Sequence, residues 1–301
     1  MINGIIIVSK EQEFTSHDVV AKMRGICRQK KIGHTGTLDP NATGVLPVCL
    51  GNATKLCDML TDHDKEYIAE FELGKTSDTL DIWGEVKRTD ADVSLLTEDI
   101  VKQVICSMKG EQMQIPPMYS AKKIAGKKLY ELARAGIEVE RKPVKIYISE
   151  IEILEMALPK VVIRVACSKG TYIRTICSDI GEKLGCGAVM TALERTKVGM
   201  FTKGNAYSLA QIQNLRDENR LEEIVIPVES CFEQYERILV KPFATKMLKN
   251  GNELYYDMLT KIPEMERCRI CDAQGQFYGV YLAQREKKAV KPWKMFFPEE
   301  G

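Results

Sequence analysis

The spacing of hydrophobic residues predicts strands and helices along most of the chain. Buried or alternating runs predict strands, and apolar residues three and four apart predict helices. The expected strands are 4–8, 44–51, 66–74, 145–154 and 160–168, and the expected helices are about 16–29, 52–60 (capped by Asn52), 97–109, a segment that ends at Gly136, and 171–185. Because these elements mix without strict alternation, we expect an α+β fold around a central, largely antiparallel sheet.

Two of the expected helices have a clear apolar face. In residues 97–109 this face is Ile100, Val104 and Met108. In residues 171–185 it is Ile173, Ile176, Cys177, Ile180 and Leu184. Arg174 lies in the first turn of this second helix, where the helix dipole disfavours a cation by roughly 0.3–1 kcal/mol. Its position therefore predicts an anionic partner, either a carboxylate or a phosphate.

Alternation is cleanest in residues 66–74, EYIAEFELG. Tyr67 shares one face with Ala69, Phe71 and Leu73. The simplest interpretation is a core tyrosine, although a buried hydroxyl still needs a hydrogen-bond partner.

The pattern changes near residue 236. Short strands, turn sequences such as NG and DAQG, and scattered Gly and Pro predict a small β-rich domain at 236–301 after a body at 1–235. So small a domain is expected to pack on the body.

The composition is that of a globular chain, with 45% hydrophobic and 28% charged residues. No apolar run reaches the ~18 residues that span a bilayer, and the first residues lack the pattern of a signal peptide. We therefore expect a cytoplasmic protein that does not bind membranes. Cys268 and Cys271 have C-x-x-C spacing, but no second pair accompanies them and they lie in an expected hairpin, so no metal site is predicted.

The net charge is +1, which argues against a general electrostatic attraction for nucleic acid. Basic residues do cluster at 28–31, 122–128 and 285–294. Each cluster alone is most simply a solvated face. A phosphate-binding surface on a near-neutral protein would have the same pattern.

The segment GHTGTLDPNATGVLP, residues 33–47, combines turn-forming residues with Asp39 and His34. Asp before Pro favours a turn or a helix start, and a histidine in a loop can simply bond the backbone. Alternatively, Asp39 is a carboxylate held on a rigid loop as a nucleophile or acid–base group, and His34 stacks on a base. These residues alone do not decide between the two interpretations.

Together, several segments resemble the bacterial tRNA pseudouridine synthase B family. They are GHTGTLDPNATGVLP, KEYIAEFELGKTSDTLDIWGEV, QIPPMYSAKKIAGKKLYELARAGIEVER and SKGTYIRTICSDIGEKLGCGAVMTALERTKVG, within about residues 4–200. The C-terminal part resembles the family's small RNA-binding PUA domain more loosely. The resemblance implies a mixed α/β catalytic domain, with an RNA-gripping insertion at about 115–145.

The resemblance also implies roles for single residues. Asp39 aligns with the catalytic aspartate, and Arg174 with the arginine that pairs with it. Tyr67 aligns with the tyrosine that stacks on the target base and is proposed to act in proton transfer. The remaining implied substrate-binding residues are His34, which helps to reshape the T loop, Tyr172 and Leu193, which contact the flipped nucleotide, and Lys10, a lysine of the N-terminal motif.

The chain departs from the family pattern at two places. The usual Lys-Pro-x-Gly-x-Thr-Ser is KEQEFTS, so Glu11 and Glu13 replace Pro and Gly. Near residue 194 the usual pair of arginines is LERT, so Glu194 replaces one cation. The first change is expected to make the N-terminal loop more acidic and less constrained.

The activity implied by the resemblance is isomerisation of a uridine in the tRNA T loop (position 55 in tRNA numbering) to pseudouridine, after base flipping. No metal or other cofactor is expected, and the expected partner is the T arm of tRNA, bound by a monomer. Whether Asp39 attacks the sugar or assists a proton abstraction stays open. The alternatives are a non-catalytic tRNA chaperone and a nucleoside or glycoside hydrolase.

Overall fold

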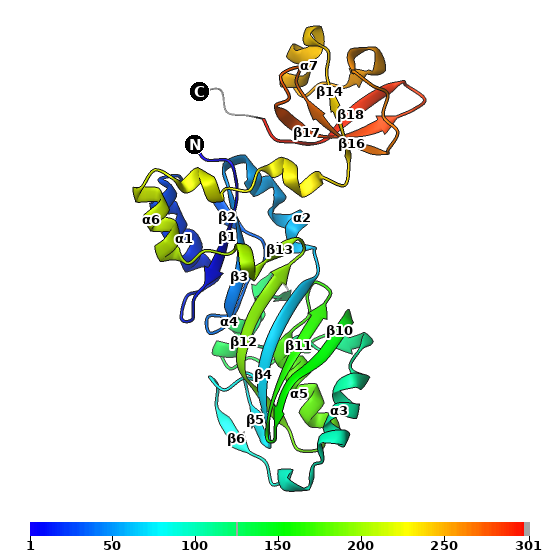
Figure 1. Ribbon diagram of the computed structural model, residues 1–301. Helices are drawn as coiled ribbons and strands as arrows, with labels where there is room; N and C mark the ends of the chain where they lie inside the picture. The colour runs from blue at the N-terminus through cyan, green and yellow to red at the C-terminus, as the bar shows by residue number, and fades with distance from the viewer. Residues whose placement is uncertain (125, 298–301) are drawn as a thin grey trace.

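A long, largely antiparallel sheet runs through the body of the molecule in the computed structural model, which describes residues 1–124 and 126–297 (Figure 1). Its strands follow the order β1-β3-β12-β4-β11-β10-β7, with β2 beside β3 and β13 beside β12. β12 and β3 pair in parallel, and the other neighbours pair antiparallel. The strands are β1 (Gly4–Lys10), β2 (Ile32–His34), β3 (Thr43–Leu50), β4 (Lys65–Leu73), β7 (Gly110–Gln114), β10 (Val144–Ala157), β11 (Lys160–Cys167), β12 (Ala188–Val198) and β13 (Phe201–Thr202). The central antiparallel sheet expected from the sequence is confirmed.

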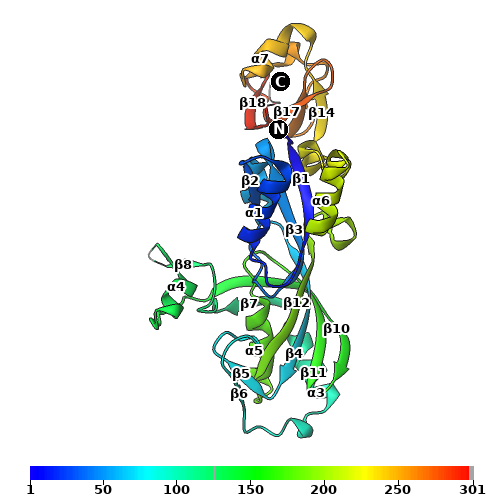
Figure 2. The same cartoon turned by 90° about the vertical axis from the view of Figure 1, so that its left-hand side faces the viewer.

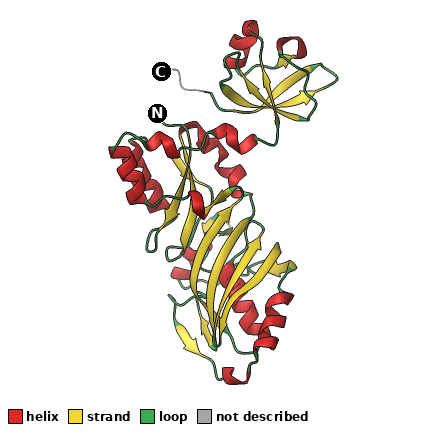
Figure 3. Ribbon diagram, viewed as in Figure 1, coloured by secondary structure: helices red, strands yellow, loops and turns green. Residues whose placement is uncertain are grey.

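Some helices pack on this sheet and others lie outside it (Figure 3). They are α1 (Ser16–Cys27), α2 (Cys57–Thr61), α3 (Glu98–Ser107), α4 (Leu129–Arg134), α5 (Ile173–Lys183), α6 (Leu209–Asp217) and α7 (Thr245–Lys249). Short 3-10 turns join them at Gly51–Leu56, Val93–Leu95, Lys203–Asn205, Leu221–Ile224, Val228–Phe232, Pro242–Ala244 and Tyr256–Met258. Within the described residues, no helix is both long enough and apolar enough to cross a bilayer.

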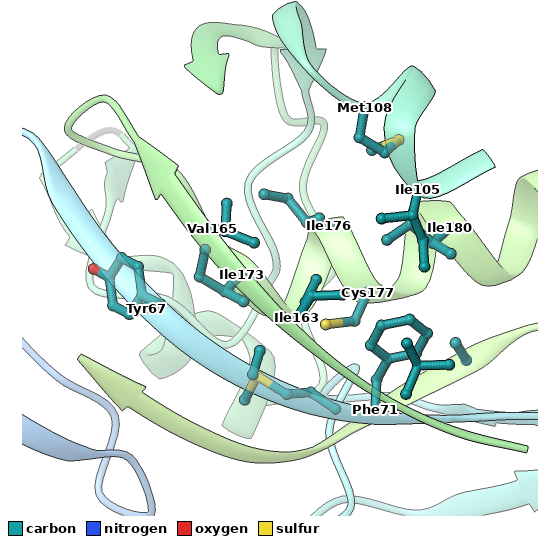
Figure 4. Close-up of a cluster of buried hydrophobic side chains, with 14 of the residues drawn as sticks. Tyr67, Phe71, Ile105, Met108, Ile163, Val165, Ile173, Ile176, Cys177 and Ile180 are labelled. Atoms are coloured by element: carbon teal, nitrogen blue, oxygen red, sulfur yellow. The ribbon is translucent and has the colours of Figure 1, made fainter. Parts of the chain in front are cut away.

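The main core lies between the inner face of β4, β11 and β12 and the apolar face of α5 (Figure 4). The expected alternation on β4 and the expected stripe on α5 are confirmed, since Phe71, Ile176 and Ile180 are fully buried. Burial of such a side chain stabilises the fold by about 1.5–3 kcal/mol. Tyr67 lies at one end of this cluster, with its hydroxyl oxygen directed away from the apolar side chains (Figure 4).

Two local expectations were wrong, at Ile100 and at Asn52. On the apolar face expected for residues 97–109, Met108 is buried and Val104 packs against the core as expected, whereas Ile100 is exposed and Val101 and Ile105 are buried instead. The reason is the helical period: the buried face is centred on residues 101, 105 and 108, and position 100 lies at its edge.

Asn52 caps no helix, because a 3-10 turn begins at Gly51. Its backbone N–H donates to Asn3 Oδ1 (2.7 Å), and its side-chain amide donates to the carbonyl of Phe297 (3.1 Å). Asn52 therefore ties the turn to two distant parts of the chain.

A second sheet begins at Glu236. Its strand order is β14-β16-β17-β18-β15, with β14 (Glu236–Leu239), β15 (Leu254–Tyr255), β16 (Arg267–Cys271), β17 (Phe277–Gln284) and β18 (Ala289–Met295). Residues 298–301 of the expected terminal domain lie outside the described residues. Cys268 and Cys271 on β16 are both buried, in two different apolar clusters, as residues three apart on a strand should be.

The two sheets share an apolar cluster. The ring of Phe232 lies 6.1 Å from that of Phe277 and 5.7 Å from that of Phe296, measured between centroids. Ile5 and Val45 of the main sheet belong to the same cluster. The β-rich part therefore packs on the body, as its size predicts.

The segment expected as an insertion extends sideways from the main sheet (Figure 2). It contains β8 (Lys123–Ile124), β9 (Lys127–Lys128) and α4, and residue 125 lies outside the described residues. A further hairpin, β5 (Lys75–Ser77) and β6 (Val86–Arg88), lies at the far end of the body.

Glu13 has a left-handed backbone, with φ of 69°. On either side, the carbonyls of Glu11 and Phe14 both accept hydrogen bonds from Lys10 Nζ (2.9 and 2.6 Å). The turn around this ammonium needs a conformation that glycine adopts freely and a glutamate does not. The loss of glycine has thus left the turn intact but strained.

Glu13→Gly is therefore expected to stabilise the protein. Relief of the left-handed conformation, partly offset by the greater flexibility of glycine when unfolded, should add about 0.5–1 kcal/mol, or about 2 °C in Tm. Differential scanning calorimetry measures this. Glu13→Ala is the matched control, because it removes the charge and keeps the strain; an equal rise in Tm for both variants would assign the effect to charge.

Candidate active site

The loop after β2 holds Asp39 by contacts on both sides. The buried Ser16 hydroxyl accepts from the backbone N–H of Leu38 (2.9 Å), and Lys10 Nζ donates to the carbonyl of Pro40 (2.8 Å). The backbone N–H of Ala42 donates to the carbonyl of Asp39 (3.1 Å), so a turn does form here. The carboxylate of Asp39 takes no part in that turn and points to Arg174 instead.

The side chain of Arg174 connects several segments of the site. Its side chain is 4% exposed, and Nε lies 2.9 Å from Asp39 Oδ2. Its Nη1 donates to the carbonyl of Thr79 (2.9 Å), and Nη2 donates to the carbonyl of Tyr119 (2.8 Å). The anionic partner predicted from its place in α5 is thus a carboxylate, and three separate segments converge on one guanidinium.

A second carboxylate lies on the other side of Arg174. Asp81 Oδ2 is 3.5 Å from Nη1 of Arg174, and Asp81 Oδ1 accepts from the Thr79 hydroxyl (2.6 Å) and the Trp83 N–H (3.1 Å). Burial raises the pKa of Asp81, while Thr79 and Arg174 oppose that rise. The sequence prediction missed Asp81, although it lies in a segment that carries the family resemblance.

Tyr67 is paired across the sheet with a buried arginine. Arg195 on β12 lies opposite Tyr67 on β4 and is 1% exposed. Its Nε donates to the carbonyl of Val45 (2.8 Å) and its Nη2 to that of Gly36 (3.3 Å). Burial raises the pKa of Tyr67 despite the opposing effect of Arg195, so the phenol stays protonated at neutral pH.

Arg195 was also missed by the sequence prediction, which weighed only the neighbouring Glu194. Glu194 forms an ion pair with Lys203 (2.7 Å). The sequence did contain a signal for Arg195. Leu193 and Arg195 are two residues apart on one strand, so their side chains lie on the same, inner face.

The start of α5 is fixed by a side-chain amide. Gln114 accepts from the backbone N–H of Tyr172 (2.8 Å) and donates to its carbonyl (3.0 Å). Tyr172 is the N-cap residue and has no side-chain cap of its own. Gln114 therefore fixes the backbone two residues before Arg174.

These side chains surround a cavity of about 760 Å³, which is large enough for a whole nucleotide. Asp39, Tyr67, Tyr172, Arg174 and Leu193, all expected from the sequence, line it. Lysines at its wall give it a basic character: Lys65, Lys122, Lys145 and Lys169.

His34 and Lys10 are placed differently. His34 ends β2, accepts a hydrogen bond at Nδ1 from the Gly36 N–H (3.3 Å), and is not part of the cavity wall. Burial lowers the pKa of His34, which leaves a neutral ring. Lys10 is buried, and its ammonium donates hydrogen bonds to three backbone carbonyls. Burial lowers the pKa of Lys10 to about 8, although the nearby Asp39 carboxylate opposes this shift.

The groups that line the cavity are suited to a substrate in which an electron-poor carbon lies beside a flat ring. The Asp39 carboxylate is 41% exposed and is oriented by a buried cation. Tyr67 and Leu193 supply flat and apolar surface, and Lys122 supplies charge for a phosphate. Lys145 and Lys169 are already paired with Glu111 and Asp62. Such a set suits a nucleotide whose bond to the base is broken and remade.

Comparison with known proteins agrees with this chemistry. A profile described as "TruB family pseudouridylate synthase (N terminal domain)" matches residues 24–173, and one described as "tRNA pseudouridylate synthase B C-terminal domain" matches residues 174–233. The chain is 47% identical to the tRNA pseudouridine synthase B of Clostridium tetani, over 98% of this chain and 99% of that protein. It is also 47% identical to the protein of that name in Lachnoclostridium phytofermentans, over 98% and 100%.

Among solved structures, the chain resembles one in the "Crystal Structure of a Cbf5-Nop10-Gar1 Complex", with a TM-score of 0.72, 28% identity, and coverage of 98% of this chain and 85% of that one. The two profiles together match residues 24–233, and the relatives and the fold match nearly the whole length. The chain belongs to the TruB family of pseudouridylate synthases.

Proposed function

We propose that this protein converts a uridine of the tRNA T loop, the one at position 55, to pseudouridine, with Asp39 as the catalytic carboxylate. The relatives named tRNA pseudouridine synthase B support tRNA as the substrate. The observation that carries the role of Asp39 is its ion pair with the buried Arg174, which orients a carboxylate into a nucleotide-sized cavity.

The proposed reaction uses few groups. The target base is flipped into the cavity, where it lies against Tyr67 and Leu193. Its bond to the ribose breaks while Asp39 acts on the electron-poor sugar: either the carboxylate bonds the sugar carbon and is released when C5 joins it, or it takes a proton from the sugar and returns it afterwards. The uracil then rotates, C5 joins the sugar, and C5 loses the proton that N1 gains overall. Arg174 holds the Asp39 carboxylate in place through their ion pair.

Asp39→Asn tests the proposal. Asparagine keeps the size and turn preference of aspartate but removes the charge, so turnover should fall by at least about 10³-fold, while tRNA affinity changes little. Pseudouridine mapping on unmodified tRNA and a binding isotherm measure the two quantities. Near-normal turnover would mean that Asp39 serves only the turn.

The same assay separates the two alternative functions. A tRNA chaperone would leave the tRNA unmodified, and a nucleoside or glycoside hydrolase would release free uracil. An isomerase yields pseudouridine at one position with no uracil released.

The projecting segment with β8 and β9 is proposed to grip the RNA backbone. Lys123 and Lys127 are exposed on this hairpin and do not line the cavity. They can therefore contact phosphates outside the target nucleotide. The β-rich part from Glu236 onward is proposed to add further RNA contacts, as the loose resemblance to PUA domains suggests.

Replacing Lys123 and Lys127 by alanine should weaken tRNA binding and reduce the slope of log K against log salt by about 1–2, since each lost phosphate contact removes roughly one released counterion. The measurement is tRNA affinity over a series of salt concentrations. Turnover of the double variant at saturating tRNA should equal that of the wild type.

The matched control is Lys102→Ala with Lys109→Ala, which removes two exposed lysines from the region of α3. This control should keep the wild-type slope. Equal slopes for both double variants would show that the hairpin lysines are only a solvated face.

A further inference from the structure

Ser120 lies in the cavity wall with an unpaired hydroxyl. The residue is 5% exposed, and its Oγ is buried without a hydrogen-bond partner. Other buried side-chain atoms without partners occur in residues 1–124 and 126–297, but Ser120 is the one that lines the cavity. This hydroxyl therefore bonds no protein atom, although its residue lines the cavity in which a substrate would bind.

The backbone around Ser120 is firmly held. Its N–H donates to the carbonyl of Met118 (2.9 Å), and its carbonyl accepts from the N–H of Tyr130 (3.1 Å). The preceding carbonyl, that of Tyr119, accepts from Nη2 of Arg174 (2.8 Å). The hydroxyl is thus carried by a fixed backbone, one residue from a contact of the guanidinium that orients Asp39.

A buried hydroxyl without a partner destabilises a folded protein, and alanine at this position would avoid that loss. Groups left in such a state gather at sites where a ligand supplies the missing bond. The position of Ser120 along the cavity wall indicates which part of a bound nucleotide its hydroxyl would contact. Asp39 must face the sugar, and Lys122, two residues beyond Ser120, is suited to a phosphate.

We propose that the Ser120 hydroxyl hydrogen-bonds an oxygen of the sugar–phosphate backbone at the target nucleotide, and so sets the ribose against Asp39. The inference rests on the proposed function and assigns to Ser120 a contact with the substrate rather than a part in the fold. Two oxygens have the required chemistry, the ribose 2′-hydroxyl and the phosphate on the 5′ side.

The test is a double-mutant cycle between Ser120→Ala and chemically altered T-arm RNA. One RNA carries 2′-deoxyuridine at the target, and another carries a methylphosphonate 5′ to it. Dissociation constants and single-turnover rates are measured for wild type and variant on these two RNAs and on the unaltered RNA. On the unaltered RNA, Ser120→Ala should lower catalytic efficiency about tenfold, the worth of one hydrogen bond.

If the proposal holds, that penalty disappears on one of the two altered RNAs, and which one identifies the oxygen. Because the lost hydroxyl had no partner, Tm should stay constant or rise. The same penalty on all three RNAs, or a fall in Tm, would overturn the proposal. Thr175→Val is the matched control, since it also removes a buried unpaired hydroxyl, but one outside the cavity wall; its effect should be the same on every RNA.

The two proposals fail in distinguishable ways. A wild-type protein that forms no pseudouridine in the unaltered RNA would reject the proposed function, and the inference with it. An active wild type with additive effects in the cycle would reject the role of Ser120 alone.

Discussion

The buried guanidinium of Arg174 is the interaction on which the site depends. It is almost inaccessible to water, so its donors must all be satisfied within the protein. The acceptors come from the Asp39 loop, from the turn that carries Asp81, and from the projecting segment at Tyr119. Truncating this side chain would leave the buried Asp81 without its cation and would release three segments at once. The geometry of the candidate site and the tertiary structure around it thus depend on the same residue.

The loops of the site follow the same principle. Lys10 and Arg195 are buried cations, and their contacts are largely with backbone carbonyls: Lys10 with those of the N-terminal turn and Pro40, and Arg195 with those of Val45 and Gly36. Apart from Val45, which lies on β3, these carbonyls lie in loops without regular partners, and an enclosed cation supplies one. In this way the protein holds the Asp39 loop without regular secondary structure, while the Asp39 side chain, paired with Arg174, stays partly exposed.

Much of the fold and part of the site followed from sequence patterns. Alternation placed Tyr67 on the inner face of its strand, and the unfavourable position of Arg174 in α5 predicted its anionic partner. Both properties are local, because each depends only on residues close together in sequence. Asp81, Arg195 and Gln114 were missed because their roles arise from contacts between segments far apart in sequence. The errors at Ile100 and Asn52 have separate causes: Ile100 lies at the edge of the buried face of its helix, and bonds to distant residues hold Asn52.

The cluster of Phe232, Phe277 and Phe296 has a consequence for how this chain can vary. These rings pack where the two sheets meet, so the two sheets share one core. Substitutions that add or remove side-chain volume in this core destabilise the protein. The C-terminal sheet is therefore not an interchangeable attachment. A change in ring size on one side requires a compensating change on the other, so the two sheets are constrained to change together during evolution.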